Sequence, residues 1–315
     1  MPHRHDTVEN YLEQKSSQID FAALFQNLIQ PDHGSDSQLA KAILHITAHP
    51  GSFIRARMAW DVGNACGLNQ ESSQRTAIAI EYFHTASLVF DDLSCMDDAI
   101  LRRGGRCTHV LFGEATAMLA ALAFINRAYS LIWQETAKLP VTQAQTVTRF
   151  VESCLGTNGV LSGQSRDLGF GPEDNTPERI LEIAEGKTVT LLRLSLCLPA
   201  MLAGASQKTT SLLSQLAHAR GLGYQIADDF KDVFQGEGES GKTSDRDRAL
   251  HRPNIVVCEG VPAAASRLRA LVNEGDQITS ELSGGQSTWL FLNDLRITVG
   301  PQLINANGIP LSGDL

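Results

Sequence analysis

The spacing of apolar residues constrains this chain more than any other feature of its sequence. In ATAMLAALAFINRAYSLIW (residues 115–133) and SLLSQLAHARGLGYQIADDF (residues 211–230), apolar residues recur at every third and fourth position. That spacing places them on one face of an α-helix, whereas the alternation of Val, Ile and Thr that is typical of strands is scarce. We therefore predict an all-α fold, built as one large helical bundle.

Helix-breaking residues divide this pattern without marking a second domain. Breaks fall at Pro50-Gly51 and in the run at residues 236–254, and no linker, internal repeat or low-complexity tract separates the helices. We predict a helical domain over residues 38–299. An N-terminal segment, residues 1–37, precedes it and is either flexible or helical, and a tail without periodicity, residues 300–315, follows it.

The composition is that of a globular protein whose surface does not suit nucleic acid. Of 315 residues, 43% are hydrophobic and 19% are charged, and the formal net charge is −9. A chain of this length can bury a large core, and its acidic balance argues against nucleic acid as a partner. The start, MPHRHDTVENYLEQ, lacks the apolar core of a signal peptide, and we predict no transmembrane segment. We therefore expect a cytoplasmic protein.

A cluster of carboxylates followed by arginines stands out at residues 90–106, FDDLSCMDDAILRRGGR. Neighbouring carboxylates repel one another unless positive charge lies among them. Either the arginines neutralise the carboxylates in a surface segment, or the carboxylates bind metal ions and the arginines bind the anion that the metals carry. The residues concerned are Asp91, Asp92, Asp97, Asp98, Arg102, Arg103 and Arg106.

A second acidic cluster favours the metal interpretation. In QIADDFKD, Asp228 and Asp232 lie four residues apart on one helical face, with Asp229 beside them. Such a pair packs poorly in an apolar helix, but its oxygens suit Mg²⁺, which commonly bridges protein carboxylates and substrate phosphates. Facing helices of a bundle can bring two such clusters together. With the basic residues Arg102, Arg103, Lys187, Lys242 and Arg252, the clusters indicate a diphosphate pocket.

These motifs resemble those of trans-isoprenyl diphosphate synthases, the polyprenyl synthetase family, over about residues 38–260. DDLSCMDDAILRRG matches the first aspartate-rich motif of the family and QIADDFKD the second, and HTASL, FGEA, GQSRDL and GKT match as well. The chain is most similar to bacterial geranylgeranyl diphosphate synthases. The resemblance implies an isoprenoid synthase-like bundle with a central active-site cavity.

The implied reaction joins isopentenyl diphosphate to dimethylallyl, geranyl or farnesyl diphosphate by ionisation, condensation and elimination. The resemblance also implies about three Mg²⁺ ions per site, which polarise the departing diphosphate. Asp91, Asp97, Asp228 and Asp232 match the metal ligands, and Asp92 and Asp229 match residues that support them or bind through water. Arg102, Lys187, Lys242 and Arg252 would bind the allylic diphosphate, Gln164 and Asp167 would help to bind substrate, and Thr188 and Gln225 would stabilise the cation.

Two carboxylates of the first motif cannot share a face of an ideal helix. Asp91 and Asp97 are six residues apart, whereas helical neighbours are three or four apart. We therefore expect the helix to loosen or end around Ser94 to Met96.

The pocket for isopentenyl diphosphate departs from the family pattern. His84, Arg103, Arg55 and Arg57 match family residues, but Ile54 replaces the family's lysine. Losing one cation costs about 1–3 kcal/mol of binding unless another base replaces it. Such a base could be Arg55 or Arg106, the latter standing where the family has proline.

This departure leaves alternatives to ordinary chain elongation. One is an enzyme that couples or cyclises allylic diphosphates, and another is a non-catalytic subunit. The second acidic motif is of the synthase kind rather than the cyclase kind, and both acidic motifs are complete, so both features favour elongation.

The residues just before the first acidic motif bear on product length. Ala86 and Ser87 lie about one helical turn before Asp91, and in this family bulky residues there shorten the product. Two small residues favour geranylgeranyl diphosphate, with farnesyl diphosphate as the alternative. The resemblance also implies a homodimer. We expect the apolar cluster of Met118, Leu119, Leu122 and Phe124 to lie in the core or along the tunnel wall.

Overall fold

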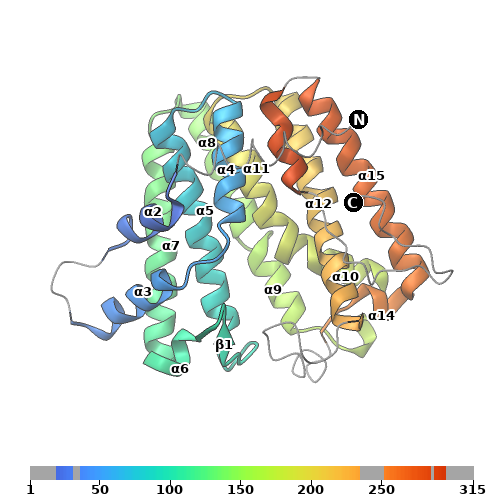
Figure 1. The fold of residues 1–315 in the computed structure, drawn as a ribbon, viewed down its shortest axis with the longest axis horizontal. Coiled ribbons are helices and arrows are strands. Elements are labelled where there is room, and N and C mark those ends of the chain that lie inside the picture. Colours follow the sequence, from blue (N-terminus) through green and yellow to red (C-terminus); the bar gives the residue numbers. More distant parts are fainter. Residues whose placement is uncertain (1–18, 31–35, 235–251, 285–286, 296–315) are drawn as a thin grey trace, which may run out of the picture.

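The computed structural model describes residues 19–30, 36–234, 252–284 and 287–295, and these are almost entirely helical (Figure 1). The predicted all-α class is confirmed. The described helices are α2 (Phe21–Asn27), α3 (Gln38–Ala48), α4 (Ile54–Ala65), α5 (Gln70–Asp91), α6 (Thr108–Phe112), α7 (Glu114–Thr136), α8 (Val141–Leu155), α9 (Val160–Leu168), α10 (Pro177–Ala184), α11 (Thr190–Leu202), α12 (Gln207–Phe234), α14 (Ile255–Glu259) and α15 (Val261–Ser283), with the 3₁₀ turns η1 (Pro172–Asp174) and η3 (Ser287–Leu295) and the π-helical turn η2 (Glu185–Val189).

Local side chains set where several helices begin. The Asn69 side chain accepts a hydrogen bond from the N–H of Ser72 at 2.9 Å and so caps α5. Thr176 caps α10 in the same way, and Pro177 occupies the first helical position, where its missing N–H costs nothing. α4 differs, because its N-cap Phe53 is in the left-handed region and makes no side-chain cap.

The largest core cluster forms around α5 and α7, which pack along each other (Figure 1). Alanines on both helices, including Ala77 and Ala120, are fully buried and allow close packing of the backbones. Tyr82 and Phe124 fill the space beside them, with ring centroids 5.3 Å apart. Each large side chain buried in this way contributes about 1.5–3 kcal/mol.

The described part of the N-terminal segment belongs to this core. Phe25 on α2 is 1% exposed and contacts the rings of Tyr82 and Phe124. The Tyr82 hydroxyl donates to the carbonyl of Phe25 at 2.7 Å. This part of the segment is therefore helical and docked. The predicted tail, residues 300–315, lies outside the described residues.

Two further clusters complete the bundle. One surrounds Phe230, where α10, α12, α14 and α15 meet, and the other lies where α11, α12 and α15 meet η3. In Figure 1 these helices form the half of the molecule opposite α2 and α3. α12, which carries the second acidic motif, contributes to both clusters, so its position is fixed from several sides.

A short β-hairpin with two residues in each strand follows α5. It is the only β structure among the described residues. β1 (Leu101–Arg102) pairs antiparallel with β2 (Gly105–Arg106). Both turn residues have positive φ, 53° at Arg103 and 75° at Gly104. A tight hairpin turn of this kind favours Asn or Gly at its first position, so the arginine there is an unusual choice.

α7 also has an exposed apolar face. By length and composition alone, it is the one helix of the described residues that could cross a membrane, a test that core helices of soluble proteins also pass. Its buried face includes Phe124, whereas Met118, Leu119 and Leu122 are 41%, 54% and 52% exposed. Of the four side chains expected in the core or along the tunnel wall, Phe124 is in the core and the other three are not.

Candidate active site

The first acidic motif folds back on itself where α5 ends. α5 ends at Asp91, and the N–H of Asp97 donates to the carbonyl of Asp91 at 2.9 Å. We expected the helix to loosen or end around Ser94 to Met96, and it does end before Asp97, but three residues earlier than Ser94. The turn returns the chain to the end of α5, so the two aspartates lie together despite their separation in sequence.

A chain of ion pairs connects this motif to three other segments. Arg252 contacts Asp97, and its Nη1 lies 3.2 Å from Oδ2 of Asp167 on α9. The same oxygen of Asp167 accepts from Nζ of Lys187 on η2 at 2.8 Å. The structure thus brings together four of the predicted site residues from distant parts of the sequence.

The charges within this group alter one another. Burial alone would lower the pKa of Lys187, but the carboxylates of Asp167 and Asp91 outweigh it and raise that pKa. Burial, together with the neighbouring charge of Asp97, raises the pKa of Asp91 to about 6, although Lys187 opposes the shift. A carboxylate in this position gains strongly from an added cation.

Glycines allow the close approach of α9 and η2. A Cβ on Gly163 would lie 2.7 Å from the Cα of Gly186, and a Cβ on Gly186 would lie 2.6 Å from the Cα of Gly163. Only residues without a side chain fit at this contact. It places Asp167 opposite Lys187, and it places Gln164 beside the first motif, with Nε2 at 3.9 Å from Sδ of Met96.

A polar ladder links η2 to the second acidic motif. The Thr188 hydroxyl donates to Oε1 of Gln225 at 3.1 Å, and Nε2 of Gln225 donates to Oδ1 of Asp229 at 2.9 Å. The other oxygen of Asp229 accepts from the N–H of Ile255 at 2.7 Å. The π-helical turn gives Thr188 this position, and such turns are frequent at functional sites.

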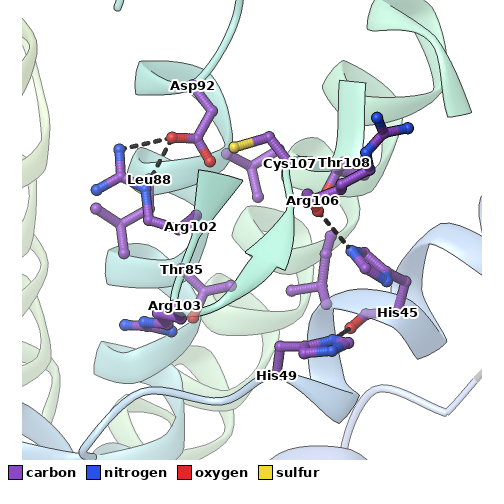
Figure 2. Close-up of a pocket in the computed structure, with 12 residues that line it drawn as sticks. His45, His49, Thr85, Leu88, Asp92, Arg102, Arg103, Arg106, Cys107 and Thr108 are labelled. Carbon is purple, nitrogen blue, oxygen red and sulfur yellow. Dashed lines mark hydrogen bonds and ion pairs between the residues drawn. The ribbon is translucent and has the colours of Figure 1, made fainter. Parts of the chain in front are cut away.

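Two of the six predicted metal residues are enclosed by protein partners. Asp229 is 2% exposed and bound as above, and Asp92 is 5% exposed. Oδ1 of Asp92 lies 2.8 Å from Nε and 2.6 Å from Nη2 of Arg102 (Figure 2). This geometry suits support of the site and not direct metal binding. It also gives Arg102 a partner that an incoming diphosphate would have to displace.

The remaining carboxylates of the two motifs are more accessible than Asp92 and Asp229. Asp228 is partly exposed, with Oδ1 at 3.7 Å from Nζ of Lys231, and Asp232 is exposed. Among the described residues, no three His, Cys, Asp or Glu side chains converge as a ready metal cage. Carboxylate oxygens are ligands that suit Mg²⁺, so the half-buried Asp91 and Asp97 and the more exposed Asp228 and Asp232 are the candidates to hold it.

The residues expected to bind isopentenyl diphosphate meet at the start of α4. Nη1 of Arg55 donates to Nε2 of His84 at 3.3 Å. Burial, and then the charges of Arg55 and Arg103, lower the pKa of His84 well below its usual range, so its ring is neutral. Arg57 is exposed, and Lys242 lies outside the described residues.

Glu81 is a buried residue of this group that the sequence motifs did not indicate. Its side chain is 2% exposed, it accepts a hydrogen bond from the backbone of Ala56, and its charge acts on Arg55 and Arg103. It thereby supplies the cap that α4 lacks. The detectable signal was a single carboxylate in the apolar run IAIEYF, three residues before His84.

The two predicted chain-length residues have different surroundings. Ala86 is fully buried in the largest core cluster. Ser87 is half-buried, and its hydroxyl donates to the carbonyl of His84 at 2.8 Å. On the helix, Ser87 shares a face with His84 and Asp91.

Comparisons with known proteins agree on what this chain is similar to. The family model described as polyprenyl synthetase matches residues 36–283. The chain is 30% identical over 267 residues to a geranylgeranyl diphosphate synthase of Pantoea ananas, covering 83% of this chain and 86% of the relative. It is also 30% identical over 284 residues to the farnesyl diphosphate synthase of Bacillus subtilis, covering 89% and 90%.

Solved structures share the fold. A geranyltransferase of Helicobacter pylori, complexed with magnesium and isoprenyl diphosphate, superimposes with a TM-score of 0.77 at 26% identity, covering 91% of this chain and 95% of that one. An FPP/GFPP synthase of Zymomonas mobilis also gives 0.77, at 24% identity, with coverage of 93% and 99%. At that lower identity the likeness concerns the fold alone.

Proposed function

This chain belongs to the polyprenyl synthetase family and is a prenyltransferase, and on that premise we propose that it condenses isopentenyl diphosphate with an allylic diphosphate to give geranylgeranyl diphosphate. The observation that carries the proposal is the ion-pair chain from Asp97 through Arg252 and Asp167 to Lys187. It sets two cations beside the carboxylates of the first motif, where a diphosphate bound with Mg²⁺ requires both.

Four carboxylates would hold the metal. Asp91 and Asp97 at the end of α5 and Asp228 and Asp232 on α12 provide oxygen ligands, and the proposal includes about three ions per site. When bound, Mg²⁺ neutralises negative charge on the departing diphosphate.

The protein's own cations act on the same group. Lys187 and Arg252 share Asp167, which orients them while the site is free of substrate. On binding, they donate to oxygens of the allylic diphosphate and stabilise the charge that develops as its carbon–oxygen bond breaks. Asp167 keeps both cations in place throughout the reaction.

Oxygen dipoles then stabilise the allylic cation. Thr188 and Gln225, fixed to each other at 3.1 Å, present oxygen lone pairs without a charge that would capture the cation. The double bond of isopentenyl diphosphate attacks the allylic carbon, a carbon–carbon bond forms, and loss of a proton restores a double bond. Arg55, Arg57, His84 and Arg103 would hold the diphosphate of this second substrate.

The small side chain at Ser87 supports a twenty-carbon product. It lies on the face of α5 that carries His84 and Asp91, so little bulk limits the growing chain there. The named relatives include both geranylgeranyl and farnesyl diphosphate synthases. Farnesyl diphosphate is therefore the second candidate product.

The exposed face of α6 and α7 supports a homodimer. Leu111 is 44%, Leu119 54% and Leu122 52% exposed, and an apolar surface of this kind suits association with a second copy. Leu119→Glu is expected to convert a dimer to a monomer in size-exclusion chromatography with light scattering. An unchanged mass would assign the face another role.

We also propose a cytoplasmic location.

The reaction is tested with purified protein, Mg²⁺ and labelled isopentenyl diphosphate, offered with dimethylallyl, geranyl or farnesyl diphosphate. We expect a twenty-carbon alcohol after dephosphorylation, and a fifteen-carbon alcohol would select the second candidate. A product made from the allylic diphosphate that contains no label from isopentenyl diphosphate would instead support coupling or cyclisation. Binding of diphosphate without any product would support a non-catalytic subunit.

A further inference from the structure

A pocket borders the isopentenyl diphosphate residues, between α3, the end of α5 and the hairpin (Figure 2). Arg103 lines this pocket, and its charge also acts on His84 and Arg55. The pocket and the expected substrate site are therefore adjacent and share a cation. Ile54, which stands where the family has lysine, is 53% exposed and has no charge to offer.

Arg103 is held in the pocket by an unfavourable backbone conformation. Its φ of 53° lies in the left-handed region, which asparagine or glycine would occupy at lower cost. A Cβ on Gly51 would lie 3.0 Å from Nη1 of Arg103, so the guanidinium packs against bare backbone. Within the described ranges, Arg103 forms no hydrogen bond or ion pair, and its donors remain available.

Thr85 provides a second unused donor. It is 3% exposed, it lines the pocket, and its hydroxyl has no hydrogen-bond partner in the described structure. A buried polar atom without a partner costs about 1–3 kcal/mol. Its position on the wall of a cationic pocket indicates that a ligand completes it.

The hydrogen bonds of His49 fix how its ring can contribute. Its Nδ1 donates to the carbonyl of His45 at 2.9 Å, because a carbonyl oxygen only accepts. In the neutral ring, Nε2 is then an acceptor and would repel an anion. Only the protonated ring has an N–H for an anion there, so anion binding and protonation of His49 are coupled.

The surrounding charges favour a bound anion. The charge of Arg102 is cancelled by Asp92 at 2.6 Å, and Nε2 of His45 donates to the carbonyl of Arg106 at 2.9 Å. Burial raises the pKa of the Cys107 thiol to about 12, so it stays neutral. The titratable and charged groups that line the pocket with His49 are His45 on α3, Asp92 at the end of α5, Arg102, Arg103 and Arg106 on the hairpin, and Cys107 just after it. The same helices also carry Lys41 on α3 and Glu81, His84 and Asp91 on α5.

We propose that Arg103, Thr85 and protonated His49 bind the terminal phosphate of isopentenyl diphosphate. They would thereby take the place of the lysine that the family has at the position of Ile54. The inference rests on the proposed elongation reaction. It predicts that loss of the His49 ring raises KM for isopentenyl diphosphate, while KM for the allylic diphosphate, which also carries a terminal phosphate, stays unchanged.

The test compares His49→Gln with the wild type in steady-state kinetics at pH 6.5. We expect KM for isopentenyl diphosphate to rise about tenfold, with the allylic KM unchanged. Adding Ile54→Lys to His49→Gln should restore the low KM. Lys41→Gln removes an exposed cation from the same helix and should change neither KM.

Unchanged KM for isopentenyl diphosphate in His49→Gln would overturn the inference and leave the elongation reaction intact. If the wild type shows no elongation, the pocket is tested by binding of inorganic diphosphate in the presence of EDTA. EDTA removes divalent metal ions, so binding that depends on the carboxylate motifs is then eliminated. Weaker binding to His49→Gln than to the wild type at pH 6.5 supports the site, and equal binding overturns it.

Discussion

The backbone N–H of Asp97 donates to the carbonyl oxygen of Asp91 at 2.9 Å, and this bond turns the chain back at the end of α5. Two carboxylates that a continuous helix would point in different directions therefore meet at one place. Burial and the charge of Asp97 hold Asp91 at a raised pKa of about 6, so the pair is arranged to receive a cation.

Asp91→Asn should remove most activity while leaving the fold intact. The amide keeps the shape of the side chain but cannot ligate Mg²⁺ as a carboxylate does, and we expect kcat to fall by about 10²–10³. Product formation with a labelled allylic substrate measures the loss. Asp36→Asn, which changes an exposed carboxylate before α3, is the control, and equal activities of the two variants would remove Asp91 from the mechanism.

The activity of the wild type should depend on the protonation of Asp91. Its pKa in the free enzyme is about 6, so below pH 6 the carboxyl is increasingly protonated and must lose a proton before it binds metal. We therefore expect kcat/KM for the allylic substrate to decline tenfold per pH unit below this value. A pH profile flat to pH 5 would contradict the assignment.

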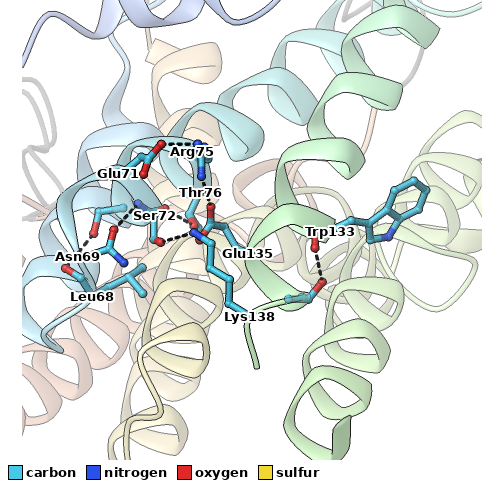
Figure 3. Close-up of polar contacts among 11 residues, drawn as sticks. Leu68, Asn69, Glu71, Ser72, Arg75, Thr76, Trp133, Glu135 and Lys138 are labelled. Atoms are coloured by element: carbon cyan, nitrogen blue, oxygen red, sulfur yellow. Dashed lines mark hydrogen bonds and ion pairs between the residues drawn. The ribbon is translucent and has the colours of Figure 1, made fainter. Parts of the chain in front are cut away.

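Glu135 should stabilise the fold through its partners at the end of α7 (Figure 3). Its side chain is 2% exposed, with Nη1 of Arg75 at 3.1 Å and Nζ of Lys138 at 2.6 Å. Glu135→Gln removes the buried carboxylate charge that both cations share and should lower the free energy of unfolding by about 2–3 kcal/mol. Glu71→Gln, which removes the exposed partner of Arg75, should cost less than about 1 kcal/mol.

The contribution of Glu135 should disappear in acid. Burial alone would raise its pKa, but hydrogen bonds from Lys138, Ser72 and Arg75 outweigh that and lower it. Since the folded-state pKa lies below the unfolded one, the stabilisation is present above the unfolded value and is lost as pH falls through the folded value. Urea unfolding of wild type and Glu135→Gln should therefore converge in acid, and a constant difference would refute this.

Gly163→Ala should separate α9 from η2. The new methyl group would meet backbone atoms of Gly186 and Lys187, and forcing them apart costs about 1–3 kcal/mol and misaligns Lys187. Thermal unfolding and kcat should both decrease. Gly169→Ala, where a Cβ would lie 3.3 Å from one carbonyl oxygen and φ is −88°, is the matched control and should be tolerated.

Ser87→Phe should shorten the product. A phenyl ring on the face of α5 shared with His84 and Asp91 would occupy space that the growing chain needs, so fifteen-carbon alcohol should become the main product. Ala86→Phe should instead destabilise the protein, because Ala86 is fully buried in the core. Chromatography of dephosphorylated products decides the first case, and an unchanged product would place the end of the tunnel elsewhere.

Helix positions and motif identities could be predicted from the sequence because both are local. The apolar spacing around Phe124 and Phe230 gave the helical class, and the two acidic motifs gave a family resemblance that the comparisons confirmed. Thr188 and Gln225 were expected to lie together in one site, and the hydrogen bond between them agrees with that expectation.

The direction of individual side chains could not be predicted, because it depends on tertiary partners. Asp92 and Asp229 lie next to ligand candidates in sequence, yet Arg102 and Ile255 enclose them. Glu81 was missed because nothing local shows that it meets the start of α4. The left-handed conformation of Arg103 could not be predicted, because the two glycines that follow it are the residues expected to adopt positive φ in this turn.

The contact between Asp97 and Arg252 joins residues 155 positions apart in the chain. A contact this distant in sequence can form only after both segments of the chain are present. A nascent chain that has not yet emerged beyond residue 252 can therefore form much of its hydrophobic core while lacking the assembled charge centre. On the mechanism proposed above, such an intermediate would not ionise an allylic diphosphate, and reactive carbocations would arise only within completed molecules.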